Sequence, residues 1–283
     1  MKFEDVENKI REISASSLNS MKLLDLAAFA APLIGISSGD DQLFAKYKDD
    51  IGDFLLLPNE WMELKYGVPF DSDGISVISW ALPQTEDTKQ KMKNETQFPN
   101  FEWSLARTFG EEFNRKLQIL MEGFFEENQV QSVAPSCNKD FRLEESPKYG
   151  FASNWSERHT AYISGLGTFG LCDGLITEAG KAARFGSIIV NCKFPVSGRK
   201  YSNYREYCLV DQGCKVCSKR CPTGAITENG HDKVKCSKYL YGTIPVYAKE
   251  KYGFEGQYGC GMCQTKVPCA SCNPKAKISK SSL

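Results

Sequence analysis

The sequence predicts an α/β (α+β) domain over residues 1–192 and a small cysteine-rich domain over residues 193–283. Nine of the twelve cysteines lie between Cys208 and Cys272. The charge divides at the same place: residues 1–192 carry 19 Lys and Arg against 29 Asp and Glu, whereas residues 193–283 carry 16 against 6. Basic surface attracts acidic partners or offsets bound anionic groups. We therefore expect an acidic domain followed, after a linker at residues 193–204, by a basic one.

Apolar residues repeat at helical spacing in three segments of the first domain. Residues 101–128 show the clearest pattern, an apolar stripe separated by charged residues, which is typical of a helix packed on a core. The segments expected to be helical are residues 2–13, 20–29 and 101–128. Residues 37–73 are expected to form loops around short elements, and the polar residues 87–100 a surface loop.

Three apolar, β-branched runs predict strands. They are residues 74–82, 130–134 and 185–192. Strands that alternate with helices along the chain are typical of a layered α/β or α+β fold.

The longest apolar stretch, residues 23–36, is interrupted by Asp25 and Pro32 and is too short to span a bilayer. The N-terminus alternates charged and apolar residues and has no signal-peptide core. We therefore expect a cytoplasmic protein that does not enter a membrane.

The cysteine spacing is the most informative motif. Cys214, Cys217 and Cys221 form C-x2-C-x3-C-P, which resembles the latter part of the bacterial ferredoxin run C-x2-C-x2-C-x3-C-P. In two-cluster ferredoxins the cysteine before the proline binds the other cluster. On that pattern one 4Fe–4S cluster, which we call cluster B, is expected to use Cys221, Cys236, Cys260 and Cys263. The other cluster is expected to use Cys214, Cys217 and two more ligands.

Two positions of this second cluster, cluster A, depart from the ferredoxin pattern. Asp211 occupies the expected first ligand position and Val267 the expected last. Cys208 and Cys269 lie just outside these positions, and we predict that they replace them. Cys272 is a rival for the last place, and Asp211 is a weaker candidate because iron–sulfur sites select soft thiolates. The predicted ligands of cluster A are Cys208, Cys214, Cys217 and Cys269.

A zinc site is the alternative, because two C-x2-C pairs are the usual spacing of a four-thiolate zinc centre. Its ligands would be Cys214, Cys217, Cys260 and Cys263. That arrangement leaves Cys221 and four further cysteines of the module without a role. The three remaining cysteines have no ligand spacing and are expected to be ordinary buried thiols; they are Cys137, Cys172 and Cys192.

A glycine-rich loop precedes the cysteine module. Gly165, Gly167 and Gly170 form a G-x-G-x-x-G sequence. A dinucleotide-binding loop would follow a strand and open a helix, whereas here a helix-like segment precedes the loop and a strand-like one follows. The glycines indicate sharp backbone turns or a closely approaching ligand.

The stretch that begins at Glu157 and Arg158 and runs through this loop, followed by the double cysteine motif, resembles the epoxyqueuosine reductase and reductive dehalogenase group. The resemblance covers residues 60–272. It implies a nitroreductase-like domain that binds cobalamin without a histidine ligand, and two 4Fe–4S clusters that pass electrons to the cobalt. It implies as cofactor-binding residues Arg158, Gly165, Leu166, Gly167, Thr168 and Gly170.

The catalytic residues depart from that group. Phe151 stands where epoxyqueuosine reductases have the Asp proposed as proton donor. Reductive dehalogenases use a Tyr with a basic neighbour instead. Tyr162 and His159 are therefore our candidate catalytic residues, with Tyr149 and Lys148 as further candidates.

These observations predict an iron–sulfur oxidoreductase that reduces a tRNA base or another electron-poor substrate and receives electrons from a small redox protein. The alternative is an electron-transfer or corrinoid-reactivating protein with no small substrate of its own. A third hypothesis is a binding domain that is stabilised by a structural zinc ion and has no redox role.

Overall fold

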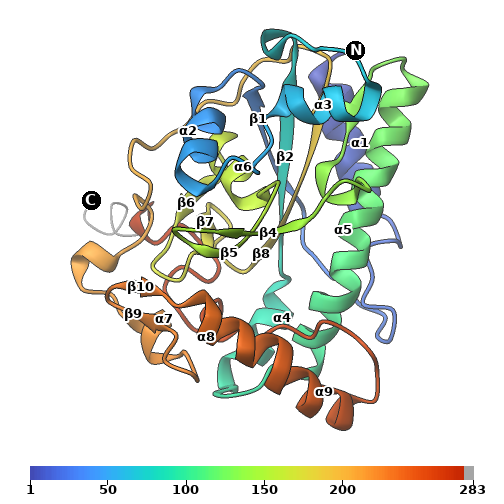
Figure 1. The fold of residues 1–283 in the computed structure, drawn as a ribbon. Helices are drawn as coiled ribbons and strands as arrows, with labels where there is room; N and C mark the ends of the chain where they lie inside the picture. The colour runs from blue at the N-terminus through green and yellow to red at the C-terminus, as the bar shows by residue number, and fades with distance from the viewer. Residues whose placement is uncertain (277–283) are drawn as a thin grey trace.

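The computed structural model describes residues 1–276 and is built around a four-stranded antiparallel sheet (Figure 1). The strand order is β1 (Leu33–Ser38), β2 (Ser76–Pro83), β8 (Ala183–Val190) and β3 (Ser132–Val133). Ile78 of β2 pairs with Ile36 on one side and with Ile188 on the other. All eight residues of β2 are buried, so both faces of the sheet are covered.

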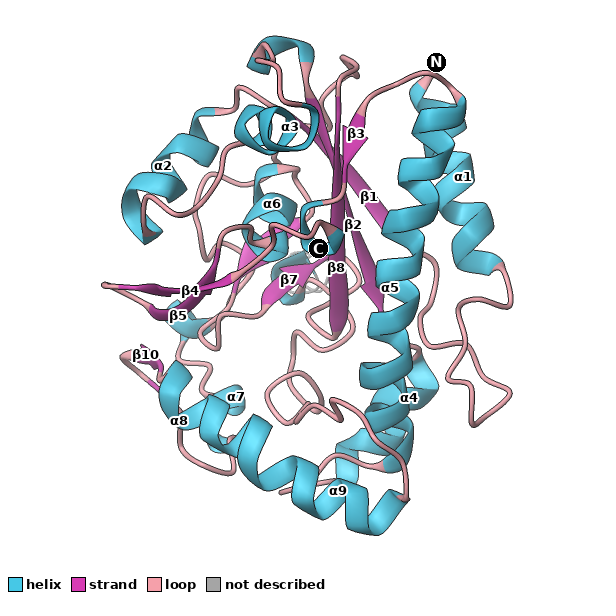
Figure 2. Ribbon diagram, turned by 45° about the vertical axis from the view of Figure 1, so that its right-hand side comes forward, coloured by secondary structure: helices cyan, strands magenta, loops and turns pink. Residues whose placement is uncertain are grey.

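Helices cover the two faces in separate groups (Figure 2). On one face α1 (Phe3–Ala15) and the long α5 (Phe101–Glu127) pack against Ile78 and Trp80. On the other face lie α2 (Gln42–Ile51), α3 (Pro58–Tyr66) and α6 (Glu157–Ile163). Successive strand residues point to opposite faces, which explains why β2 supplies both cores.

The remaining elements are short. The helices are α4 (Glu86–Lys91), α7 (Val216–Lys219), α8 (Lys233–Lys238) and α9 (Ile244–Tyr252), the last two joined by a π-helical segment, Tyr239–Thr243. Single 3-10 turns occupy Ser72–Gly74, Met92–Asn94, Pro135–Cys137 and Val210–Gln212. Three two-stranded hairpins are formed by β4 (Leu143–Ser146) with β5 (Gly150–Ser153), β6 (Gly167–Phe169) with β7 (Leu175–Thr177), and β9 (Ile226–Thr227) with β10 (Gly230–His231).

Five of the predicted elements are confirmed, whereas β1, at one edge of the central sheet, is not among the predicted strands. The predicted helices at 2–13 and 101–128 are α1 and α5, and the predicted strands at 74–82 and 185–192 are β2 and β8. The strand predicted at 130–134 is the short β3. The mixed class is confirmed in its α+β form, because every pair of neighbouring strands runs antiparallel.

The helix predicted at residues 20–29 is wrong. The chain there forms irregular turns organised by the buried Asn19 side chain. Its amide nitrogen donates to the carbonyls of Ser14 and Phe29, and its amide oxygen accepts from the Phe29 N–H. These bonds satisfy backbone groups that a helix would have paired internally.

Residues 37–73, expected to form loops around short elements, contain the helices α2 and α3. The surface loop expected at 87–100 is partly wrong, because it contains most of α4. Each of these helices has a local start signal. Asp41 accepts from the Leu43 N–H, Pro58 opens α3, and Thr85 accepts from the Thr88 N–H.

The cysteine-rich half lies beneath one end of the sheet, with α8 and α9 at its outer side (Figures 1 and 2). The segment expected to be a linker packs on the first domain, since Phe194 is buried and the Ser197 N–H donates to the carbonyl of Ile36. No helix within residues 1–276 is long and apolar enough to cross a membrane. Residues 277–283, the end of the predicted second domain, lie outside the described part.

Candidate functional site

The four cysteines predicted for cluster A line one small cavity. Lys181 and Leu171 of the first domain line it with them. The cysteines are Cys208, Cys214, Cys217 and Cys269. Four soft thiolate donors around one cavity are the ligand chemistry that an iron–sulfur cluster requires.

Local backbone geometry brings the first three of these thiols together. Gly213 adopts a left-handed conformation with φ +81°, which turns the chain between Cys208 and Cys214. The N–H of Cys214 then donates to the carbonyl of Leu209, and α7 carries Cys217 one turn further.

Asp211 and Val267, the two residues that depart from the ferredoxin pattern, differ in their exposure. Asp211 is exposed on its 3-10 turn. Val267 is buried in a small apolar cluster with Leu171 and Cys217. The thiol of Cys272, the rival ligand, lies 3.5 Å from the carbonyl of Pro268. The choice of Cys208 and Cys269 as replacements stays a prediction.

The predicted cluster B cysteines lie near one another. Burial, and then the nearby thiols of Cys236 and Cys221, raise the pKa of Cys260 to about 11. Cys263 lies beside Cys260 and also reaches Cys172. Within residues 1–276 no three His, Cys, Asp or Glu side chains form a group that could hold a single metal ion.

Cys172 and Lys181 are the residues that the sequence analysis missed. Cys172 is expected to be an ordinary buried thiol, yet it packs in one small cluster with Cys217 and Cys263, one from each predicted set. The ammonium of Lys181 donates to the Cys172 sulfur at 3.1 Å. Hydrogen bonds from Cys217 and Cys263, followed by the nearby ammonium, lower the pKa of Cys172 despite its burial. No spacing rule connects Cys172 to the later cysteines, so the sequence offered no direct signal.

The candidate catalytic residues belong to an aromatic cluster on α6. The ring centroid of His159 lies 4.5 Å from that of Tyr47 and 4.9 Å from that of Phe169. Its Nδ1 lies 2.7 Å from the Ser156 hydroxyl. Loss of solvent, and then the charges of Arg158 and Lys233, lower the pKa of His159 to about 3. The ring is therefore neutral near pH 7.

Tyr162 also packs against Phe169. Its ring centroid lies 6.0 Å from that of Phe169 and 5.1 Å from that of Tyr201. Burial raises the pKa of the Tyr162 phenol, so the hydroxyl keeps its proton at neutral pH. Tyr204 stacks on Phe169 at 4.6 Å and completes this side of the cluster.

The glycine loop is packed by the protein's own backbone. A Cβ atom added at Gly167 would lie 2.0 Å from the carbonyl oxygen of Ile176, and one at Gly165 would lie 2.3 Å from that of Gly198. The hydroxyl of the buried Thr168 accepts from the Tyr207 N–H. Leu166 is buried, and Gly170 donates its N–H to the carbonyl of Gly174. These contacts account for the glycines without a ligand, and their cofactor-binding role stays a prediction.

The two residues at the start of α6 have different surroundings. Ser136 and Ser187 donate to the Glu157 carboxylate at 2.5 and 2.6 Å, which joins α6 to β8. Removal from solvent raises the pKa of Glu157 to about 7, although these hydrogen bonds oppose the shift. Arg158 is exposed and donates to the carbonyl of Asp173 at 2.6 Å, close to Cys172 in the chain.

The aromatic cluster and the cysteines are neighbours. Phe169 precedes Cys172 by three residues, which sets an upper limit of about 11 Å between their Cα atoms. Tyr207, whose ring packs against that of Tyr201, directly precedes Cys208. Cys208 and Cys269 also pack against the core that contains Tyr162 and Phe169, so these cysteines adjoin the aromatic cluster.

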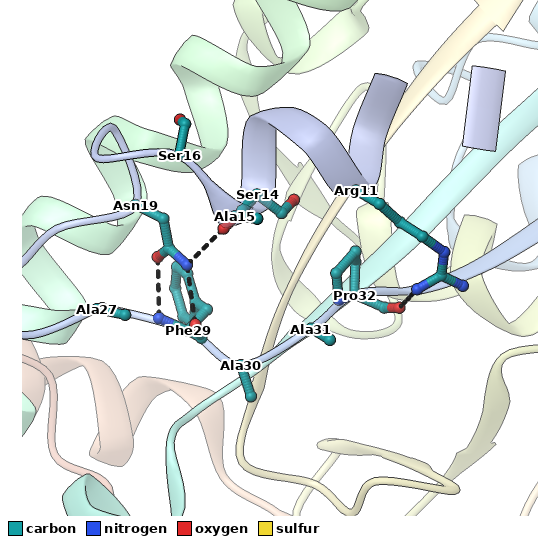
Figure 3. Close-up of a pocket in the computed structure, with 10 residues that line it drawn as sticks. All are labelled: Arg11, Ser14, Ala15, Ser16, Asn19, Ala27, Phe29, Ala30, Ala31 and Pro32. Atoms are coloured by element: carbon teal, nitrogen blue, oxygen red, sulfur yellow. Dashed lines mark hydrogen bonds between the residues drawn. The ribbon is translucent and has the colours of Figure 1, made fainter. Parts of the chain in front are cut away.

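A larger cavity of about 380 Å³ lies at the end of α1 (Figure 3). Its lining contains Arg11, which donates to the carbonyl of Pro32, and Asn19, whose amide is already bonded to backbone groups. It brings together no set of groups suited to catalysis, so the cysteine cavity and the aromatic cluster are the candidate site.

Known proteins share parts of this arrangement. No protein-family model matches the chain. Over 120 residues the chain is 33% identical to an epoxyqueuosine reductase of Bacillus cereus, and the match covers 40% of this chain and 29% of that relative. The chain resembles the epoxyqueuosine reductases. A relative of the same name from Bacillus anthracis is 32% identical over a stretch of the same length.

Solved structures show the same fold. An epoxyqueuosine reductase crystallised with an epoxyqueuosine-modified tRNA stem loop superposes with a TM-score of 0.51 at 18% identity, over 95% of this chain and 66% of that one. A reductive dehalogenase, whose structure suggests a mechanism for B12-dependent dehalogenation, superposes with a TM-score of 0.54 at 14% identity. The superposition covers 87% of this chain and 32% of that one. The predicted resemblance to this group is confirmed, and the curated relatives are matched over less than a third of their length.

Proposed function

We propose that this protein is an iron–sulfur oxidoreductase of the epoxyqueuosine reductase type. The observation that carries the proposal is the cavity lined by all four predicted cluster A cysteines, next to the aromatic cluster. The cysteines fit two 4Fe–4S clusters by donor chemistry, with Cys208, Cys214, Cys217 and Cys269 on cluster A and Cys221, Cys236, Cys260 and Cys263 on cluster B.

Cobalamin is the second cofactor that we propose. Its support is the fold shared with a B12-dependent dehalogenase. The glycine loop offers no open cradle, because carbonyls of the chain occupy the space beside Gly165 and Gly167. When bound, the cofactor would supply a cobalt centre for reduction of the substrate.

The chain's own residues have definable roles in such a reduction. The thiols hold the clusters, and the aromatic cluster excludes water from the adjacent space. Tyr162 keeps its phenolic proton at neutral pH and is our proposed proton donor. His159 is neutral and positioned by Ser156, so it acts as a hydrogen-bonding group rather than as a cationic acid.

The substrate class is an electron-poor organic molecule, and epoxyqueuosine in tRNA is the first to test. The related reductase solved with a modified tRNA stem loop supports this choice. We infer a small redox protein as electron donor, because the cysteine-rich half carries 16 Lys and Arg against 6 Asp and Glu. The alternative function, an electron-transfer protein with no small substrate of its own, is supported by the same excess of positive charge.

Metal analysis tests the proposal. After anaerobic reconstitution and incubation with cobalamin, we expect about eight irons and one cobalt per chain. Eight irons without cobalt would favour the electron-transfer protein. A colourless protein that contains zinc would contradict both the reductase and the electron-transfer protein.

Cysteine variants test the ligand sets. Cys217→Ala and Cys236→Ala should each lose about four irons, one cluster in each case. Cys192→Ala is the matched control, because this cysteine lies outside both sets, and it should keep all eight. Full iron content in Cys217→Ala would contradict the cluster A assignment. Reduction of epoxyqueuosine in tRNA by the wild-type protein, lost in Tyr162→Phe, would support the proposed substrate and donor.

A further inference from the structure

Lys181 is a buried lysine among cysteines. Lys181 is 3% exposed and Cys172 is 5% exposed. The ammonium of Lys181 donates to the sulfur of Cys172 at 3.1 Å. It lines the cavity that contains the cluster A thiols. The polar partner that the structure gives this buried side chain is the sulfur of Cys172, and the cysteines of the cavity lie beside it.

The backbone fixes Lys181 in this place. Its N–H donates to the carbonyl of Cys269 at 2.8 Å. Gly180, with φ +90°, allows this approach, because a Cβ there would lie 2.3 Å from the carbonyl oxygen of Ala270. Gly174 leaves room for the lysine stem, since a Cβ there would lie 2.8 Å from its Cδ.

A buried ammonium needs an anionic partner, because an unpaired one costs several kcal/mol. The partner that the structure provides is sulfur. Cys172, to which Lys181 donates, packs in one small cluster with Cys217 of the cluster A set and Cys263 of the cluster B set. The pair Lys181–Cys172 therefore lies where the two ligand sets meet.

The charge and hydrogen bonds around a cluster set its reduction potential. An adjacent cation, and donors to ligand sulfurs, stabilise the reduced cluster, which carries one more negative charge. We propose that Lys181 raises the reduction potential of cluster A, with Cys172 as a non-ligand thiol that holds the ammonium between the two clusters. This inference rests on the two-cluster function proposed above.

The test is an EPR-monitored redox titration of the reconstituted full chain. Lys181→Met should lower the midpoint potential of cluster A more than that of cluster B, with iron content unchanged. Lys181→Arg should stay close to wild type, because it keeps the charge. Lys219→Met is the matched control: this lysine is exposed and follows Cys217 by two residues, so its loss should shift neither potential.

Several outcomes would overturn the inference. Unchanged midpoints in Lys181→Met, or an equal shift in Lys219→Met, would show that the buried charge has no special effect. If Lys181→Met loses iron, Lys181→Gln is measured, and loss of cluster A in both would make the lysine a structural support. Loss of about four irons in Cys172→Ala would make Cys172 a ligand instead. A wild-type chain that binds no iron would refute the proposed function itself.

Discussion

The two halves of this protein are held together by different means. The sheet half has two extensive apolar cores, one on each face of a strand, β2, that is buried at every position. The cysteine half has short helices and one hairpin, and only small apolar clusters, one of which includes the thiol of Cys217. We therefore expect the first half to be stabilised mainly by apolar burial, and the second to depend also on what its thiols bind.

The largest expected effect comes from removing the metal. In reconstituted protein treated with an iron chelator, amides of residues 208–270 should exchange with solvent at least about 100-fold faster, because the thiols no longer share a partner. Amides of β1, β2 and β8 should keep their protection. Hydrogen exchange followed by mass spectrometry measures both, and equal loss in the two halves would contradict the comparison.

A smaller effect is expected where the halves meet. Gly180→Ala places a Cβ 2.3 Å from the carbonyl oxygen of Ala270 and should cost about 3 kcal/mol or more of unfolding free energy, with iron lost from cluster A. Gly198→Ala is the control, because Gly198 also has positive φ, +70°, but nothing lies within 4 Å of its added Cβ. It should cost only about 1 kcal/mol. Urea denaturation and iron analysis would measure the difference, and similar losses in both variants would exclude the close approach as its cause.

The smallest effect concerns the sheet half and pH. The pKa of Glu157 is raised from 4.5 to about 7, so the folded state binds the extra proton more tightly than the unfolded chain. Its contribution to stability is full below pH 4.5 and is lost as the pH rises to about 7. The upper limit of the loss is about 3.4 kcal/mol, at 1.36 kcal/mol for each pKa unit.

Glu157→Gln should flatten this pH dependence between pH 5 and pH 8. Glu126→Gln, an exposed change on α5, should leave it unchanged. The midpoints of urea denaturation at pH 5 and pH 8 measure this pH dependence. An identical change of midpoint with pH in wild type and in Glu157→Gln would refute the role given to Glu157.

The parts of the fold that could be predicted are those with local signals. The apolar stripe of α5 and the β-branched run of β2 depend on neighbouring residues, and so does the cysteine spacing of Cys214, Cys217 and Cys221. The missed helices α2 and α3 carried start signals at Asp41 and Pro58. The apolar period of α3 is weak, whereas α2 is clearly amphipathic and could have been predicted.

The rest depends on contacts between distant parts of the chain. Asn19 prevents a helix at 20–29 only because it bonds to the backbone at Phe29. Cys172 meets Cys217 and Cys263, and Lys181 meets Cys269, through tertiary packing that no spacing rule encodes. Sequence reasoning therefore predicted a ligand set, which stays a prediction, and missed the residues Cys172 and Lys181 that lie beside it.

The pairing of Lys181 with Cys269 also sets an order of assembly during synthesis. All four strands of the central sheet are complete at Val190, whereas Cys269 emerges from the ribosome about 80 residues later. At roughly 5 to 20 residues per second, this leaves several seconds in which the sheet can form while Lys181 is still hydrated. The cysteine segment would then pack against a folded sheet, and the Lys181 ammonium would be desolvated only when the cysteines pack around it.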